Sequence, residues 1–256
     1  MKTMKKSLKL FLIALLIVPC MFMLSACGDD DSDDTKGLKT TYNANFTTED
    51  KALSVFSDSF GGVGYNKDAK TITLFKAGNK DQGPNTYFGE TDKNLDWDSD
   101  GTIVSIKLNI DSSDYAIGEG FNYTVAVNGN DGKFVSERSI YVRKYEEGVK
   151  VGYIYNGSSD QINQSATSSD DAKVLEDGWY TFKFDFHKNA QDLAKVTISV
   201  VNDQNETVFE VVDAKLNKSD DSDINEDEVL GLRYGWFSWM TVDSIECSAL
   251  TVQEIN

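Results

Sequence analysis

Two sets of side chains that could bind a saccharide stand at alternate positions of the segments 141–145 and 179–187. They are Tyr141, Arg143 and Tyr145 in the first segment, and Trp179, Lys183, Asp185 and His187 in the second. Residues two apart share one face of a β-strand, so each set would lie on one face of its strand. Rings pack on the C–H faces of sugars, while polar groups hydrogen bond to hydroxyls. If the strands are neighbours in a concave sheet, the seven side chains line one groove; otherwise they are exposed residues of a half-solvated sheet.

His187 is the single histidine of the chain, so any imidazole chemistry must use it. With a tyrosine and an arginine or lysine it could abstract a proton from a uronate, as a polysaccharide lyase does. A histidine that ends a strand is more often a surface residue. The sequence contains no zinc-spaced Cys/His cluster, no nucleophile elbow and no phosphate-binding glycine loop. We therefore predict no catalytic residue.

The segment DWDSDG at 96–101 is similar to the start of a calcium-binding loop. Asp96, Asp98 and Asp100 would supply oxygen ligands at alternate positions, and a glycine follows at the sharp turn. The twelfth position of an EF-hand loop is Lys107 instead of glutamate, so the full motif fails. The three aspartates are candidates for a looser Ca²⁺ site, and the alternative is an acidic turn before a strand. No other cofactor is predicted.

The segment 178–187 must position the second set of side chains. Tyr180, Phe182, Phe184 and Phe186 occupy every second place, and mostly polar residues occupy the places between. This period predicts a β-strand with one buried aromatic face, because a helix would spread the rings around its circumference. Burial of four rings contributes roughly 6–12 kcal/mol at ~1.5–3 kcal/mol each.

Similar short segments recur along the chain and predict an all-β protein. Alternation at 71–75, 103–110, 121–127, 139–145, 149–155, 194–201, 207–212, 233–240 and 245–252 is separated by turns rich in Gly, Asn and Asp. No amphipathic helix of ten residues or more is evident, and the mix of apolar and small residues at 52–60 weakly favours a strand. Residues 42–256 are therefore predicted to form an antiparallel two-sheet β-sandwich. Cys247, Trp236 and Trp239 are expected in its core.

The first 27 residues have the pattern of a processing signal. Four lysines precede an apolar run from 10 to 23, and LSAC at 24–27 resembles the lipobox of bacterial lipoproteins. The resemblance implies a signal peptide at 1–26 and lipidation of Cys27, which would hold the protein at the outer face of a bacterial cell membrane. An ordinary signal peptide or a membrane-spanning helix is the alternative. The acidic stretch 27–41 would be a flexible tether.

The charge argues against nucleic acid as a partner, and the cysteine content argues against an intramolecular disulfide. The chain has 42 acidic and 25 basic residues and a formal charge of −17. Such a charge argues against nucleic acid as a partner, because phosphate backbones require Lys and Arg. Cys20 would leave with the signal peptide and Cys27 would be lipidated, so Cys247 has no partner for an intramolecular disulfide.

Three segments together resemble the concanavalin A-like lectin/glucanase sandwich. They are GWYTF at 178–182, VTISV at 196–200 and LRYGWF at 232–237. The resemblance implies a jelly roll whose concave sheet holds a saccharide, and some members are glycoside hydrolases or polysaccharide lyases. The paired-acid motif of the hydrolases is absent. Asp243 and Glu246 stand three apart on opposite strand faces, whereas retaining hydrolysis needs carboxyls about 5–5.5 Å apart.

These features favour a membrane-anchored, extracytoplasmic lipoprotein that binds glycan or other cell-surface material through its concave sheet, without catalysis. One alternative is a polysaccharide lyase or glycoside hydrolase on the same fold. Another is a structural or protein-binding surface lipoprotein.

Overall fold

The structure is a computed structural model, and it describes residues 38–78, 81–88, 101–129, 134–155, 172–216 and 229–255. These residues belong to one compact unit, Lys36–Asn256. The predicted lipidation site Cys27 and the predicted calcium ligands Asp96, Asp98 and Asp100 lie outside the described residues. Within the described ranges, no helix combines the length and the apolar character that crossing a membrane requires.

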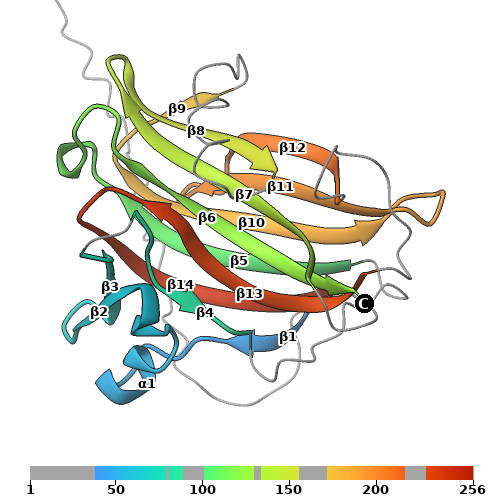
Figure 1. The fold of residues 1–256 in the computed structure, drawn as a ribbon, viewed down its shortest axis with the longest axis horizontal. Coiled ribbons are helices and arrows are strands. Elements are labelled where there is room, and N and C mark those ends of the chain that lie inside the picture. Colours follow the sequence, from blue (N-terminus) through green and yellow to red (C-terminus); the bar gives the residue numbers. More distant parts are fainter. Residues whose placement is uncertain are drawn as a thin grey trace, which may run out of the picture. The chain divides into compact units, whose positions relative to one another are not determined.

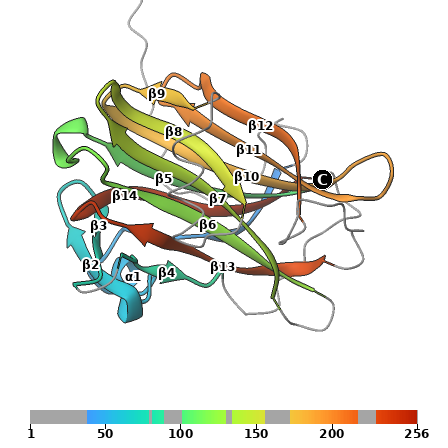
Figure 2. The same cartoon turned by 45° about the horizontal axis from the view of Figure 1, so that its top comes forward.

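The described strands form two antiparallel sheets, which Figures 1 and 2 show as two layers. The eight-stranded sheet contains, in order, β12 (Thr207–Lys215), β11 (Ala194–Asn202), β10 (Gly178–Lys188), β5 (Gly101–Ile110), β14 (Ser244–Ile255), β3 (Thr71–Lys76) and β2 (Gly61–Asn66), with β1 (Leu38–Asn43) beside β14. The six-stranded sheet contains β4 (Asn85–Thr86), β13 (Val229–Met240), β6 (Gly120–Gly129), β7 (Phe134–Tyr145), β8 (Gly148–Tyr155) and β9 (Lys173–Leu175). The predicted all-β, antiparallel two-sheet sandwich is confirmed.

The core lies between the two sheets and is centred on β10. Tyr180, Phe182, Phe184 and Phe186 are all buried, as their alternation predicts. The ring of Phe182 meets Phe121 of β6 edge-to-face with centroids 6.0 Å apart, and Phe184 meets Tyr123 at the same distance. Because these contacts join one sheet to the other, the aromatic face of β10 fixes the sheet-to-sheet packing.

Short helical elements replace the strand expected at 52–60. Helix α1 (Glu49–Leu53) and the 3₁₀ turn η1 (Asp58–Phe60) occupy this region, and a second 3₁₀ turn, η2 (Ser112–Asp114), follows β5. Acidic residues in the first turn of α1 favour its N-terminus, and only Ala52 of the helix is buried. The prediction of a strand was wrong. A helix that buries a single small residue has no apolar periodicity that could distinguish it from a strand.

The strand β1 begins at Leu38, inside the stretch that the sequence assigned to the tether. It pairs with residues Thr251–Ile255 of β14, and its first three residues are exposed. A strand with so little burial shows no alternation of apolar residues, so its start cannot be read from the sequence pattern.

Candidate functional site

The two predicted sets of site residues lie on different sheets. β10 pairs with β5 and β11, whereas β7 pairs with β6 and β8. The condition for a common groove, that the two strands are neighbours in one sheet, is therefore not met, and the seven side chains do not line one groove. Alternation is a local signal that gives the face of each strand, but it does not say which strands pair.

The first set lies on the outer face of the six-stranded sheet, which is the face turned away from the core. Ile140 and Val142 of β7 are core residues, so Tyr141, Arg143 and Tyr145 point the other way. Tyr141 belongs to a separate small apolar cluster with Ile154 and Trp239. We call this side of the six-stranded sheet the outer face.

One row of directly opposed residues crosses the middle of the outer face. Trp239 of β13 stands opposite Asn122 of β6, which stands opposite Tyr141 of β7, which stands opposite Gly152 of β8. The tyrosine ring lies over Gly152, where a β-carbon would collide with it. Glycine at this position therefore lets the ring lie flat across the neighbouring strand.

The Arg143 guanidinium packs on the indole of Trp239, 4.4 Å from the ring centroid. Such a cation–π contact holds both side chains against the sheet. Arg143 is 9% exposed, and burial lowers the pKa of its guanidinium. Next to it, burial raises the pKa of Tyr145, whose ring lies 5.3 Å from the ammonium of Lys150. We call Asn122, Tyr141, Arg143 and Trp239 the Trp239 cluster.

Several buried polar atoms of the outer face have no hydrogen-bond partner. Both the oxygen and the nitrogen of the Asn122 carboxamide lack one, although the residue is 0% exposed. The Arg143 Nε, the Trp236 Nε1 and the Asn85 Oδ1 are also unpaired. A buried unpaired polar group costs about 1–3 kcal/mol, so these atoms require an explanation.

Trp236 and Trp239, which the alternation predicts in the core, both lie on the outer face, where Trp239 is buried in the small cluster with Tyr141 and Ile154. The pairing of β13 with β6 shifts between Phe237 and Trp239, which marks a β-bulge. The bulge turns Trp239 to the outer face, although it stands two residues after the core residue Phe237. Trp236 stands opposite Thr124, another outer-face residue. Asn122 stands between the core rings of Phe121 and Tyr123. A polar residue at this position of the alternation could have identified it as an outer-face residue.

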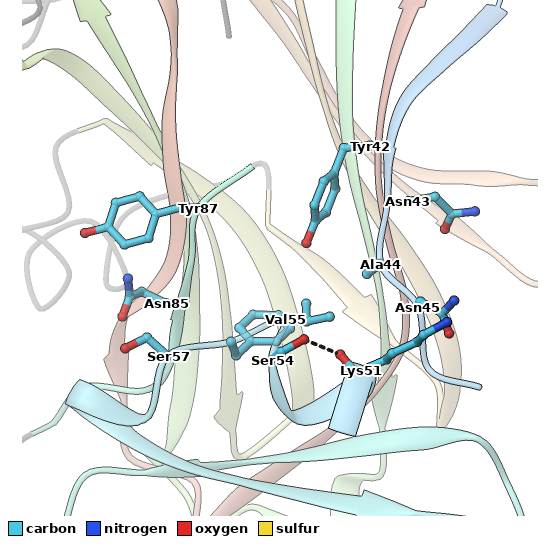
Figure 3. Close-up of a pocket in the computed structure, with 11 residues that line it drawn as sticks. Tyr42, Asn43, Ala44, Asn45, Lys51, Ser54, Val55, Ser57, Asn85 and Tyr87 are labelled. Carbon is cyan, nitrogen blue, oxygen red and sulfur yellow. Dashed lines mark hydrogen bonds between the residues drawn. The ribbon is translucent and has the colours of Figure 1, made fainter. Parts of the chain in front are cut away.

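A cavity of about 460 Å³ lies beside the edge strand β4. Figure 3 shows Tyr87, Asn85 and Ser57 on one side and Tyr42, Asn43 and Lys51 on the other, with Val55 between them. Its lining consists of Tyr42, Asn43, Ala44, Asn45, Lys51, Ser54, Val55, Phe56, Ser57, Asn85 and Tyr87. Asn85 also stands opposite Trp236, so the cavity borders the outer face.

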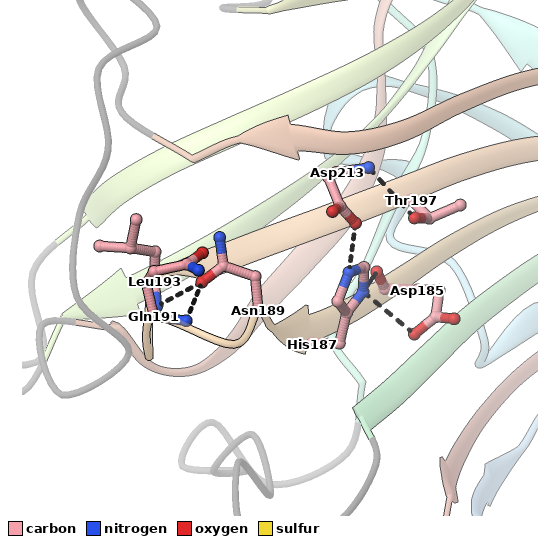
Figure 4. Close-up of polar contacts among 7 residues, drawn as sticks. All are labelled: Asp185, His187, Asn189, Gln191, Leu193, Thr197 and Asp213. Carbon is pink, nitrogen blue, oxygen red and sulfur yellow. Dashed lines mark hydrogen bonds and ion pairs between the residues drawn. The ribbon is translucent and has the colours of Figure 1, made fainter.

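The second predicted set lies on the opposite side of the molecule, on the outer face of the eight-stranded sheet. The imidazole Nε2 of His187 lies 2.8 Å from Asp213 Oδ1, and its Nδ1 lies 3.0 Å from the Asp185 carbonyl oxygen (Figure 4). The carboxylates of Asp185 and Asp213 raise the pKa of His187 to about 9, and Asp213 makes the closer side-chain contact. The imidazole is therefore protonated at neutral pH and unsuited to act as a base.

Trp179 and Lys183 share this surface with His187 but contribute little to a common site. Trp179 stands opposite Asn109 at the start of β10, and His187 stands opposite Lys195 near its end. The part of the chain that the structure describes contains no group of three or more His, Cys, Asp or Glu side chains that could hold a metal ion.

Comparison with known proteins finds similar folds among solved structures only. No protein-family model matches the sequence, and the curated proteins provide no match either. The carbohydrate recognition domain of Emp46p is similar, with a TM-score of 0.50 and 10% identity over 84% of this chain and 96% of that one. The alginate lyase Aly36B (TM-score 0.46, 14% identity, 86% and 97% covered) and an alginate lyase from Aplysia kurodai (0.42, 11%, 85% and 99%) are also similar. The chain thus has a two-sheet sandwich fold like that of the Emp46p domain.

Proposed function

We propose that the outer face of the six-stranded sheet binds a glycan through the Trp239 cluster, without cleaving it. The observation that carries this proposal is the Asn122 carboxamide, which is fully buried and unpaired at both polar atoms between Trp239 and Tyr141. A carboxamide offers donors and an acceptor, and a sugar hydroxyl is both donor and acceptor. One hydroxyl pair could therefore satisfy both atoms of Asn122.

The neighbours of Asn122 fit the same class of ligand. The Trp239 indole and the Tyr141 ring supply apolar surfaces for the C–H faces of a pyranose, and Arg143 supplies a further donor at Nε. The likeness of the fold to a carbohydrate recognition domain supports the choice of a saccharide over other polar ligands.

A glycan can reach Asn122 only if neighbouring side chains move, because the carboxamide is covered in the free protein. The Arg143–Trp239 stack is the contact that such a movement would open. Burial strengthens the hydrogen bonds that then form, since the site has a low local dielectric constant. Binding should therefore change the tryptophan fluorescence of the protein.

Titration of the purified protein with neutral and acidic oligosaccharides, with and without Ca²⁺, tests the proposal by calorimetry and fluorescence. Trp239→Ala should weaken binding by about tenfold or more, as loss of a central aromatic anchor does. Trp179→Ala is the matched control, because it removes the same side chain from the opposite surface. Loss of binding in Trp179→Ala with full binding in Trp239→Ala would place the site on the other sheet and contradict the proposal. A Ca²⁺ requirement would support the predicted site at Asp96, Asp98 and Asp100.

The rival function is a polysaccharide lyase that uses Tyr145 as its base beside Arg143. Burial raises the pKa of Tyr145, which disfavours its phenolate. His187, the other candidate base, is held as a cation on the opposite surface. We therefore infer binding rather than cleavage. An unsaturated product, detected by its ultraviolet absorbance and lost in Tyr145→Phe, would contradict this inference.

We further propose, from the sequence pattern alone, that a lipid at Cys27 anchors the protein to the outer face of a bacterial membrane. Two or three acyl chains would hold the protein stably, since each buried CH₂ contributes about 0.8 kcal/mol. Cys27→Ser should release the protein from the membrane fraction. Retention of this variant on membranes would argue for a different anchor.

A further inference from the structure

Four aromatic rings form a continuous row at the β4 side of the outer face, which we call the ring row. Ring centroids are 6.1 Å apart between Tyr87 and Tyr234, 6.0 Å between Tyr234 and Trp236, and 6.4 Å between Trp236 and Phe60. Tyr87 is 52% exposed and Phe60 is 38% exposed. Grouped exposed rings mark surfaces that a ligand covers. The ring row is thus a second aromatic surface, separate from the Trp239 cluster.

The cavity beside β4 has a lining that suits a neutral, hydroxyl-rich group. Its side chains provide carboxamides, hydroxyls, the Tyr42 ring and one ammonium group, that of Lys51. No aspartate or glutamate is among the described lining residues, although the chain has 42 acidic residues. A volume of about 460 Å³ lies within the range of small-molecule sites.

Asn85 and Tyr87 join the cavity to the ring row. Both residues line the cavity, Asn85 stands opposite Trp236, and Tyr87 contacts Tyr234. The Asn85 Oδ1 and the Trp236 Nε1 are both buried and unpaired, and Asn85 is 7% exposed. An acceptor and a donor on opposed residues can both be satisfied by a single sugar hydroxyl.

We propose that the glycan site extends from the Trp239 cluster along the ring row to this cavity, so that its ligand is an oligosaccharide chain and not a mono- or disaccharide. This inference rests on the glycan binding proposed above. From Tyr141 on β7 to Asn85 on β4 the site crosses three strand intervals, which is about 14 Å at ~4.8 Å each. One sugar ring cannot bridge this span, whereas a chain can place rings over both aromatic surfaces and one unit in the cavity.

Affinity as a function of chain length tests the extension. The probes are disaccharides and hexasaccharides of two series, cello-oligosaccharides and polyuronate oligosaccharides, titrated against the full chain. At least one hexasaccharide should bind about tenfold more tightly than its disaccharide, because it adds aromatic contacts. Tyr87→Ala should remove most of that gain. Ser54→Trp, which fills the cavity from an exposed position, should do the same.

Phe75→Ala is the matched control, because Phe75 is a 42% exposed aromatic residue on a strand of the other sheet. Its affinities should equal those of the wild type. Equal affinities of the wild type for short and long probes would overturn the extension while leaving the proposed function intact. Undiminished hexasaccharide binding by Ser54→Trp would likewise overturn the role of the cavity. No binding of any probe by the wild type would refute both proposals together.

Discussion

Replacing His187 by glutamine should reveal a stabilising ion pair that depends on pH. In the folded protein the imidazole contacts Asp213 and Asp185, which raise its pKa from the ordinary 6.5 to about 9. Such a difference corresponds to roughly 3.5 kcal/mol at ~1.4 kcal/mol per pKa unit. The Asp213 side chain is 50% exposed, so solvent screening reduces the expected contribution to about 2 kcal/mol.

The sign of the effect follows from the direction of the pKa change. A group whose pKa is raised on folding binds its proton more tightly in the folded state, so protonation stabilises the fold. The contribution is complete below about pH 6.5 and is lost as the pH rises through about 9.

Urea denaturation of wild type and His187→Gln across this window measures the contribution directly. The wild type should be about 2 kcal/mol more stable than the variant at pH 6, and the difference should shrink steadily toward pH 9.5. Because the chain has one histidine, its ring resonance also gives the pKa by NMR without assignment. Asp213→Asn should lower that pKa while tolerating the positive φ of 55° at this residue. A pH-independent difference, or a measured pKa near 6.5, would contradict the stabilising ion pair of His187.

Three further outcomes test the core and the site. Phe184→Ala should lower the free energy of unfolding by about 3–5 kcal/mol in urea, because the ring is fully buried between the sheets. Gly152→Ala should displace the Tyr141 ring and weaken glycan binding about tenfold, with an unchanged circular dichroism spectrum. Burial raises the pKa of the Cys247 thiol far above its ordinary value, so peptide mapping should find it alkylated only after unfolding.

The fold could be predicted from the sequence because its main signal is local. Alternation in β10 gave both the strand and its buried face, and Phe182 and Phe184 lie where the pattern puts them. Pairing between strands is a non-local property, and the same alternation fits several strand orders. The sequence therefore indicated that Tyr141 and Asp185 face outward, but it could not show that they face away from each other.

Bulges account for the rest of the difference between prediction and structure. In β13 a shift before Trp239 changes the face of a residue that strict alternation assigns to the core. Between β11 and β12, two residues, Val212 and Asp213, oppose Thr197, and this shift presents the Asp213 carboxylate to His187. An extra residue in one strand depends on its partner strand, so no pattern within a single segment reveals it.

The place of β14 sets the order in which this molecule can be assembled. This strand, the last that the structure describes, is inserted between β5 and β3, and it also carries β1. Neither half of the larger sheet can be joined to the other until residues 244–255 have been synthesised. Closing contacts between such distant segments is slow, because the entropy of the intervening chain must be lost first. Completion of the larger sheet should therefore be a late step of folding.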